Sequence, residues 1–398
     1  PYPVRGGLCE ASGFMNQGNS LKYWDALNSL DFFVVQDLWK TPTVGAADIV
    51  LPVCHWLEVD CPRLSQGATG AQGANCRCIE PPADCHFDVD IILDVYKRMG
   101  IPWADDPVSY GLPEGVQWPT TEQLYDRTIS TTGLTWQEYK ESFQEHGWWD
   151  CRAINPEVWG TYRRYETGRM SAIGETPAGN PMKGFSTPTR KQELWSTVME
   201  TYEPSGKFNL PSWEPAPRTE LADPSIVEEW PFLMTTGRRI PVYFHSEHRQ
   251  LPWCRELWPV PKCEINPVDA EKLGVTQGDW VWIESPEGKV RQTVDLYYGV
   301  EPGVINCEHQ WWYPELDQAG GGFELSTINC LVTGEDQDPI CGASYLRAYN
   351  VKVYKATADN SPFGNPVPCG EDGTPIICDA SDPRLLDWMP NYEIRNEA

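Results

Sequence analysis

The stretch Asp31–Pro52, DFFVVQDLWKTPTVGAADIVLP, decides the fold class that the sequence predicts. Phe32–Val35 is a short continuous apolar run, which is typical of a strand covered on both faces of a parallel sheet. Leu21–Leu30 precedes it with apolar residues at helical spacing. The run ends at Asp37, a polar loop follows, and a second strand is predicted at Asp48–Leu51. This order of helix, strand, loop and strand indicates α/β winding, in which ligands bind at the carboxyl ends of strands.

Polar residues follow the first of these strands. Asp37 stands at the predicted strand end, and Thr41 and Thr43 lie in the loop after it. An Asp at this position commonly bonds the ribose or a base edge of a nucleotide. The alternative is a helix N-cap or a hydrogen bond within the loop, and the residues taken alone favour that alternative.

A second stretch, Met234–Gln250 (MTTGRRIPVYFHSEHRQ), joins a predicted strand end to a cluster of cations. The small residues and Gly237 would let backbone N–H groups approach a ligand closely. Arg238 and the arginine after it supply planar donors for an anionic group. Two interpretations are equally supported: a site for a phosphate- or pterin-bearing cofactor, or a surface loop whose charges neutralise nearby acids.

Composition excludes several classes of protein. The chain has 398 residues, enough for two or three domains, with 31 Lys and Arg against 57 Asp and Glu and a net charge of −26. Nucleic acid is therefore an unsuitable partner, because its binding needs clustered Lys and Arg. The sequence contains no run near the roughly 18 apolar residues that span a bilayer.

The fourteen cysteines are scattered and do not resemble a disulfide scaffold. Pro62–Cys85, rich in Gly, Ala, Ser, Gln and Cys, is predicted to be a long loop. It contains Cys76-Arg-Cys78 and ends at Cys85-His86, without the paired C-x-x-C spacing of a zinc site. We expect free thiols there and no metal site, and the sequence shows no cysteine run for an iron–sulfur cluster.

The rest of the chain divides by composition. Residues 1–105 form the predicted α/β part, and residues 106–225 form an irregular helical and connecting region that ends in a Pro-rich linker. Residues 226–360 combine short strands with a small helix, capped by Asn266 and closed by Gly274, which suggests a barrel-like β domain. Residues 361–398 are rich in Pro and Asp and are expected to be a tail that wraps something else.

Several stretches resemble, in the same order, the molybdopterin oxidoreductases of the dimethyl sulfoxide reductase family. Asp31–Pro52 resembles the family pattern of a strand ending in Asp, a T-x-T loop and A-D-hydrophobic-L-P. Gly184–Ser196 is similar to its Gly-Phe-x-Thr…Lys-x-Glu-Leu-x-Ser segment. The TGR and HS elements after Thr235, with the later WW-x-PE and N…DP…G elements, resemble its C-terminal dinucleotide-binding domain. The matches run from Gly13 to Tyr354, and their shared order is more specific than any one motif.

The resemblance implies a fold, cofactors and site residues. The fold is a partial doubly wound parallel-sheet domain, α/β, followed by a C-terminal double-psi, barrel-like β domain that caps the cofactor. The cofactors are two molybdopterin guanine dinucleotides that hold molybdenum or tungsten. The residues implied for one guanosine end are Gly13, Asn16, Asp37, Thr41 and Thr43, and those for pterin or phosphate are Thr236, Gly237, Arg238, His245 and Ser246. Asn329 and Arg347 are further candidates, with turn stabilisation and a surface ion pair, respectively, as their alternatives.

The resemblance is incomplete, because the family's N-terminal cysteine cluster and the region that supplies the metal's protein ligand do not appear. With no initiator Met or signal peptide, we expect the C-terminal half of a larger subunit, with the catalytic residues and a four-iron four-sulfur cluster upstream of Pro1. Such a segment would contain two cofactor walls and no chemical centre, and we expect it to be inactive alone. Cytoplasmic, exported and partner-mediated membrane locations all stay open.

Within the family, the long Cys-containing loop and the YFHSEHRQ form resemble the branch with acetylene hydratase, pyrogallol transhydroxylase and catechol dehydroxylases. That branch implies a reductive dehydroxylase of catechol-like aromatics in an anaerobe, with a small-molecule substrate and an iron–sulfur electron-transfer subunit. The alternatives are a sulfur-oxyanion or polysulfide reductase, a formate dehydrogenase, or a non-catalytic binding subunit of the same fold.

Overall fold

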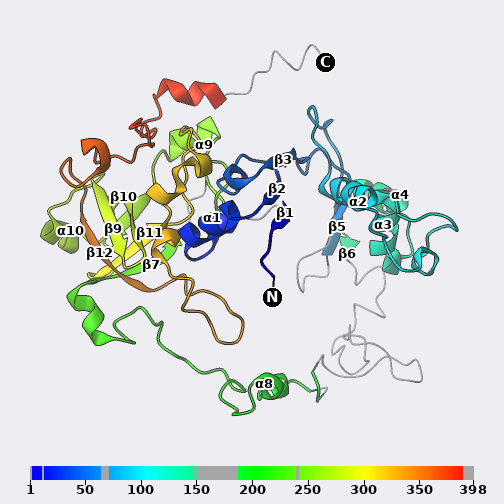
Figure 1. Ribbon diagram of the computed structural model, residues 1–398, viewed down its shortest axis with the longest axis horizontal. Coiled ribbons are helices and arrows are strands. Elements are labelled where there is room, and N and C mark those ends of the chain that lie inside the picture. Colours follow the sequence, from blue (N-terminus) through cyan, green and yellow to red (C-terminus); the bar gives the residue numbers. More distant parts are fainter. Residues whose placement is uncertain are drawn as a thin grey trace. The chain divides into compact units, whose positions relative to one another are not determined.

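The computed structural model describes residues 2–10, 13–63, 71–147, 149–150, 187–189, 191–238 and 242–388. They form two compact units: unit 1 is Pro1–Leu51 with Glu214–Ala398, and unit 2 is Pro52–Trp213. The contacts therefore join the N-terminal residues to the C-terminal half of the chain (Figure 1). The division into four segments stays a prediction.

Unit 1 begins with the predicted α/β element. Strands β1 (Gly6–Glu10), β2 (Phe32–Asp37) and β3 (Ile49–Pro52) form a sheet with β2 in the middle, and β1 runs parallel to β2. The predicted helix is α1 (Ser20–Asn28), whose Leu27 packs in one core with Phe33 and Val35 of β2. The strand is covered on both faces except at its start, because Val35 and Gln36 are buried and Phe32 is 48% exposed. The α/β winding itself is confirmed.

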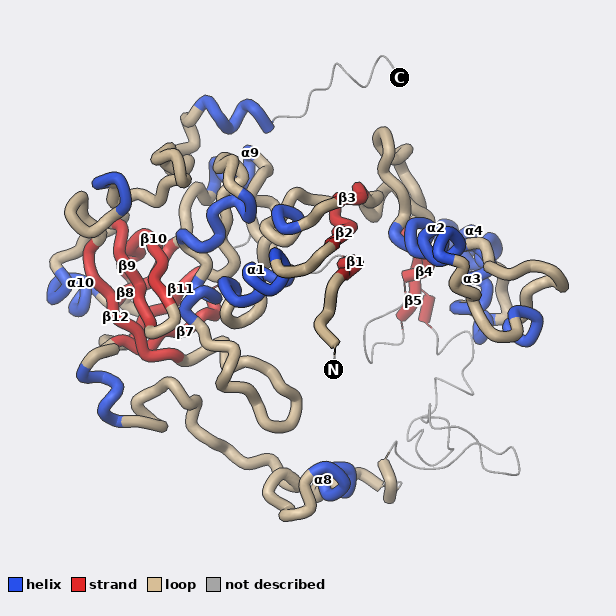
Figure 2. The backbone as a smooth tube through the Cα atoms, in the orientation of Figure 1, coloured by secondary structure: helices blue, strands red, loops and turns tan. Residues whose placement is uncertain are grey.

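The C-terminal half of unit 1 is a closed barrel with the strand order β10-β8-β11-β7-β12-β9 (Figure 2). Its strands pair in mixed directions, with β7 parallel to β11, β8 parallel to β10, and antiparallel pairs elsewhere. Closure pairs each of these six strands on both sides, and their apolar side chains fill the interior. The expected barrel-like β domain is confirmed. The strands are β7 (Phe232–Arg238), β8 (Lys262–Ile265), β9 (Trp280–Ser285), β10 (Gly288–Leu296), β11 (Val304–Glu308) and β12 (Tyr349–Lys355).

Short helices connect the strands of this unit. Helix α10 (Pro267–Leu273) has the predicted caps: Asn266 accepts a hydrogen bond from the Val268 amide, and Gly274 ends the helix with a φ of 66°. The other helix is α9 (Pro252–Leu257). The 3-10 turns are η1 (Phe14–Asn16), η2 (Val44–Ala46), η5 (Pro224–Glu228), η6 (Ala319–Leu325), η7 (Ile328–Leu331), η8 (Pro362–Gly364) and η9 (Pro383–Trp388).

The described residues of the C-terminal segment, 361–388, do not form the expected tail that wraps something else. Its described residues pack on the chain's own unit, where Ile376 and Ile377 are buried. Arg255 of α9 donates a hydrogen bond to the Ile377 carbonyl at 3.0 Å, and Arg291 of β10 donates to the Asn365 carbonyl at 3.0 Å. The Pro- and Asp-rich composition does not indicate these hydrogen bonds, because their donors, Arg255 and Arg291, lie far away in the sequence.

Unit 2 packs helices on a small sheet. The sheet consists of β4 (Cys61–Arg63), β5 (Ala71–Asn75) and β6 (Trp149–Asp150). The prediction of a long loop over 62–85 is therefore wrong in part, because β4 and β5 pair as antiparallel strands, with Pro62 opposite Ala74 and Arg63 opposite Gly73. Helix α4 starts with a capping box, in which Thr135 and Glu138 each accept the other's amide hydrogen. The helices are α2 (Asp88–Met99), α3 (Thr121–Thr128), α4 (Trp136–His146) and α8 (Thr197–Tyr202), with turns η3 (Pro107–Tyr110) and η4 (Ser130–Thr132).

In the part of the chain that the structure describes, no helix has the length and apolar character needed to cross a membrane.

Candidate cofactor-binding site

The end of β2 carries the first group of predicted residues. Asp37 accepts hydrogen bonds from the Trp39 amide at 3.1 Å and from the Thr41 hydroxyl at 3.3 Å, as the loop alternative expects. Burial raises the pKa of the Asp37 carboxyl, although these hydrogen bonds oppose the shift. Thr41 and Thr43 are buried. The loop is thus fixed by its own polar residues, and one of them is a partly buried carboxyl group.

The turn after Thr43 is held against the barrel unit. A β-carbon built on Gly45 would lie 2.4 Å from the backbone nitrogen of Gly320. Gly320 has a φ of 78°, which favours glycine. Two glycines therefore let η2 and η6 approach backbone to backbone, and this contact sets the position of the loop after β2.

Four predicted residues meet at a second place, although they come from opposite ends of the sequence. Asn329 donates its side-chain amide to the Asn16 carbonyl at 2.5 Å, and Asn16 donates its own to the Ser246 hydroxyl at 3.4 Å. Gly13 accepts the Asn16 backbone amide at 2.8 Å, and a β-carbon on Gly13 would displace the Asn16 side chain. Trp312 of the WW-x-PE element donates to the Ser246 carbonyl at 2.7 Å.

The loop that carries His245 and the segment after β11 hold buried polar groups without hydrogen-bond partners among the described residues. The Nδ1 atom of His245, both amide atoms of Gln250 and the Oε1 atom of Gln310 have no hydrogen-bond partner among the described residues. Both amide atoms of Gln36, the residue before Asp37, are in the same state. Leaving a buried polar group unsatisfied costs about 1–3 kcal/mol, so each of these groups is suited to bind a polar ligand.

This loop also contacts the loop after β2. The rings of Trp39 and His248 meet edge to face with 6.1 Å between their centroids.

Gln36, Gln250 and Gln310, which carry these unpartnered atoms, were not among the site residues predicted from the sequence. The only signal for Gln36 is a polar amide within an apolar run, and the sequence gives no comparable signal for Gln250 or Gln310.

The remaining predicted residues lie around the end of β7. Thr236 donates its hydroxyl to the Leu346 carbonyl at 2.6 Å, next to the exposed Arg347. The Gly237 amide donates to the Asn306 side chain at 3.3 Å, and a β-carbon on Gly237 would meet nothing within 4 Å. In the barrel, Arg238 of β7 is paired with Glu308 of β11. The side chain of Arg238 is not among the described parts of the structure. Residues 184–186 and 190 of the predicted family segment also lie outside the described residues.

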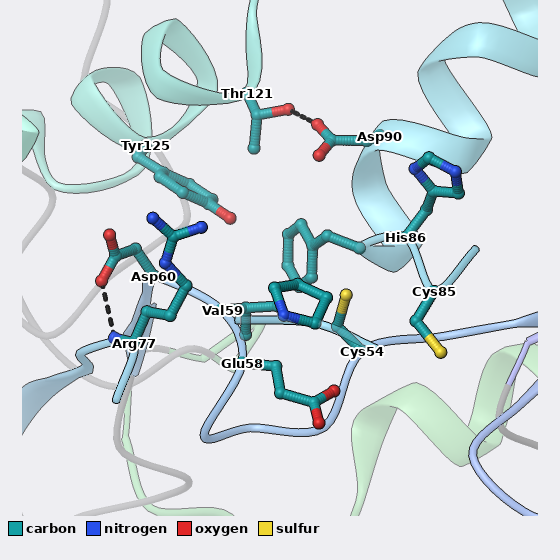
Figure 3. A pocket seen from close by; sticks show the side chains of 12 residues that line it. Cys54, Glu58, Val59, Asp60, Arg77, Cys85, His86, Asp90, Thr121 and Tyr125 are labelled. Carbon is teal, nitrogen blue, oxygen red and sulfur yellow. Dashed lines mark hydrogen bonds between the residues drawn. The ribbon is translucent and has the colours of Figure 1, made fainter. Parts of the chain in front are cut away.

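Unit 2 contains a polar pocket of about 340 Å³ whose lining includes Cys85 and His86 of the predicted cysteine cluster, but neither Cys76 nor Cys78 (Figure 3). Cys54, Cys85 and His86 line it, together with the carboxylates Glu58 and Asp90. Burial, with a smaller contribution from Glu58, raises the pKa of the Cys54 thiol to about 11. The described residues contain no group of three or more metal-ligating side chains. At neutral pH this pocket presents a protonated thiol.

Known proteins share sequence and structure with this chain. A family model described as the molydopterin dinucleotide binding domain matches residues 232–349. The chain is 48% identical to dopamine dehydroxylase of Eggerthella lenta, over 99% of this chain and 42% of that protein. It is 29% identical to acetylene hydratase of Syntrophotalea acetylenica, over 89% of this chain and 44% of that protein.

The structure is also similar to that of acetylene hydratase from Pelobacter acetylenicus. The TM-score is 0.72 at 25% identity, and the likeness covers 89% of this chain and 45% of that one. The chain therefore spans less than half the length of these relatives.

The residues present fit the group that the matched domain binds. A molybdopterin dinucleotide has anionic phosphates and two ring systems rich in donors and acceptors, and the partnerless groups of Gln36, His245 and Gln310 are suited to bind such edges. The matched range starts at β7, ends at β12 and contains both His245 and Asn329. The ordered motifs, the matched domain and the structural likeness together show that the chain belongs to the dimethyl sulfoxide reductase family of molybdopterin oxidoreductases.

Proposed function

We propose that this chain binds two molybdopterin guanine dinucleotides in a longer molybdenum or tungsten enzyme that removes a ring hydroxyl group from catechol-like aromatics. One observation carries the cofactor proposal. Gly13, Asn16, Ser246 and Asn329 converge next to His245, whose buried Nδ1 atom has no hydrogen-bond partner among the described residues, although sequence separation gives them no local reason to meet. A sheet end beside a loop of the barrel unit suits a ligand with several polar edges.

Different residues of the chain would bind different parts of the cofactor. Asp37 would accept hydrogen bonds from the N–H groups of a guanine, and Thr41 and Thr43, with Gly13 and Asn16, would shape the guanosine end. Thr236, Gly237 and Arg238 would donate to phosphate or pterin, helped by His245, Ser246, Asn329 and Arg347. When bound, the metal and its pterin dithiolenes supply the two-electron redox chemistry, while the protein orients the substrate and excludes competing reactions.

The choice of reaction rests on the relative with 48% identity, which is a dopamine dehydroxylase. Reductive loss of a ring hydroxyl takes up two electrons and two protons and releases one water molecule. We propose that an iron–sulfur subunit delivers the electrons. We assign no metal ligand and no catalytic residue within this chain, and place both, with a four-iron four-sulfur cluster, in the part of the relatives' length that the chain does not span.

Analysis of the full-length protein tests the cofactor proposal. Mass spectrometry of metals should find one molybdenum or tungsten atom per protein, and acid hydrolysis should release two GMP molecules. Absence of both metals and of GMP would instead support a non-catalytic binding subunit.

An activity assay tests the substrate class. With a low-potential electron donor, the full-length protein should convert a catechol to a monophenol. A sulfite dehydrogenase chain of Allochromatium vinosum and formate dehydrogenase H of Escherichia coli are also relatives, at 24% and 23% identity. Turnover of a sulfur oxyanion or formate, with none of catechols, would reject the dehydroxylase proposal and keep the cofactor proposal.

A further inference from the structure

Arg249 is a buried cation that is not among the proposed binding residues, and its role needs a separate explanation. Its side chain is 2% exposed, and its guanidinium lies 3.9 Å from the ring centroid of Tyr243 and 4.6 Å from that of Trp311. Burial lowers the pKa of Arg249 to about 10, so it is charged at neutral pH. Keeping this cation between two aromatic faces, away from water, is costly unless its N–H groups are bonded.

The N–H groups of its two terminal nitrogens connect two segments through backbone carbonyls, whereas Nε has no hydrogen-bond partner among the described residues. One terminal nitrogen donates to the Glu247 carbonyl at 2.9 Å, and the other donates to the carbonyls of His245 at 2.9 Å and Gln310 at 3.4 Å. His245 and Gln310 both have left-handed backbones, with φ values of 50° and 60°. Residues with a β-carbon rarely adopt this region, so contacts from outside must hold them there.

The same two residues carry partnerless polar atoms. The Nδ1 atom of His245 and the Oε1 atom of Gln310 are buried without a hydrogen-bond partner among the described residues. Their positions depend on the backbones whose carbonyls Arg249 binds. We infer that Arg249 is the positioning residue of the dinucleotide site, holding His245, Ser246 and Gln310 in the conformation that receives the cofactor. This inference rests on the proposed function.

The geometry requires an arginine. A guanidinium offers several donors in one plane, and that plane can stack on two aromatic rings while its edge binds three carbonyls. A lysine ammonium keeps the charge but is a compact, strongly hydrated group without a planar face. Arg249→Lys therefore removes the connection between the two segments while the charge remains.

Arg291 provides a matched control. It is 1% exposed, lies 4.6 Å from the ring centroid of Trp282, and donates to the carbonyls of Asn365, Pro366 and Val367 at 3.0, 3.1 and 3.2 Å. It thus fixes a backbone in the same way, but in the C-terminal segment and not at the loop of His245. Arg291→Lys should cost comparable stability without disturbing the proposed site.

The experiment compares Arg249→Lys, Arg249→Gln and Arg291→Lys in the full-length protein made in a host that synthesises the dinucleotide. We measure GMP released per protein, hydrogen exchange of the amides of residues 243–250 and 309–311, and the unfolding temperature. The Arg249 variants should release at least tenfold less GMP than the wild type, and exchange in those segments should be at least tenfold faster. Arg291→Lys should stay within twofold on both measurements.

The outcomes separate this inference from the proposed function. GMP content within twofold of the Arg291→Lys level in both Arg249 variants overturns the inference, and so does unchanged exchange. A wild type that contains no GMP rejects the dinucleotide proposal itself. The exchange measurement does not need bound cofactor, and Arg249→Gln keeps a planar donor should Arg249→Lys fail to fold.

Discussion

The side-chain amide of Asn329 donates a hydrogen bond to the backbone carbonyl of Asn16 at 2.5 Å, across 313 positions of the chain. Asn329 is 6% exposed and lies in η7, after the barrel strand β11. Asn16 in turn contacts Ser246 in the loop after β7. One amide therefore joins the N-terminal segment to the matched dinucleotide-binding domain, which is a larger role than the turn stabilisation that the sequence left open.

Removing this amide should loosen the site. Asn329→Ala leaves the Asn16 carbonyl without its partner, and we expect a loss of about 1–3 kcal/mol in the free energy of unfolding, measured by urea denaturation. The GMP content of the full-length protein should fall with it. The control is Asn209→Ala in unit 2, where a buried amide donates to the Ser196 carbonyl at 2.6 Å. Equal GMP loss in both variants would contradict a local role for Asn329.

Asp37 gives a prediction about pH. Because burial raises its pKa in the folded protein, folding disfavours the ionised carboxylate. Its contribution to stability is therefore complete below the unfolded pKa and is lost as pH rises through the folded pKa. Asp37→Asn keeps an acceptor for the Trp39 amide, removes this dependence, and leaves the protein at least as stable at pH 7. Urea denaturation between pH 4 and pH 7 measures the effect.

The same variant tests the proposed binding role. An Asn side chain has one acceptor oxygen and an NH2 donor in place of the second, so it cannot bind two N–H groups of guanine side by side as a carboxylate does, and the GMP content of Asp37→Asn should fall at least tenfold. A stable variant with wild-type GMP content would remove Asp37 from the site.

The sequence predicted the elements that local patterns determine. The apolar run of β2 and the caps of α10 at Asn266 and Gly274 are set by neighbouring residues, and both were found. The short strands and the small helix of residues 226–360 predicted a barrel-like β domain, but not its strand order. Arg249 and Gln310 could not be predicted, because their importance depends on left-handed backbones and on carbonyls far away in the sequence. The burial of the C-terminal segment could not be predicted for the same reason, because its hydrogen-bond donors lie far away in the sequence.

The close approach of Gly45 and Gly320 predicts a steric effect. Gly45→Ala would place a β-carbon 2.4 Å from a backbone nitrogen that cannot rotate away, and overpacking of this kind typically costs about 1–3 kcal/mol. Gly237→Ala should change stability little, because its β-carbon would meet nothing within 4 Å. Thermal unfolding of the two variants measures the difference. A Gly45→Ala protein as stable as Gly237→Ala would show that η2 is free to move.

In the pocket of unit 2, we expect the Cys54 thiol to react slowly with alkylating reagents. With its pKa raised to about 11, against an ordinary value of 9.0, Cys54 has on the order of 100-fold less thiolate at pH 8 than an ordinary cysteine. Iodoacetamide should therefore label Cys54 much more slowly than the exposed Cys78, as followed by mass spectrometry. Because the negative charge of Glu58 opposes ionisation, Glu58→Gln should lower the pKa and speed labelling. Unchanged labelling in that variant would show that Glu58 does not contribute to the raised pKa of Cys54.

The WW-x-PE element contributes a buried ion pair whose loss should release the C-terminal segment. Glu315 accepts two hydrogen bonds from Arg255 at 2.8 and 3.0 Å, and their side chains are 1% and 0% exposed. The same carboxylate accepts the Ile377 amide at 2.7 Å. Glu315→Gln leaves a buried guanidinium without its counter-charge, so we expect a loss of about 3–5 kcal/mol in the free energy of unfolding.

The surface pair of Lys355 and Asp279 is the control, because its side chains are 43% and 24% exposed. Lys355→Met should cost less than about 1 kcal/mol, since solvent screens such a pair. Urea denaturation gives both values, and hydrogen exchange of residues 374–388 reports the release of the segment. Glu315→Gln should speed that exchange and Lys355→Met should not. Equal exchange in the two variants would mean that the segment is held by its buried isoleucines and not by the ion pair.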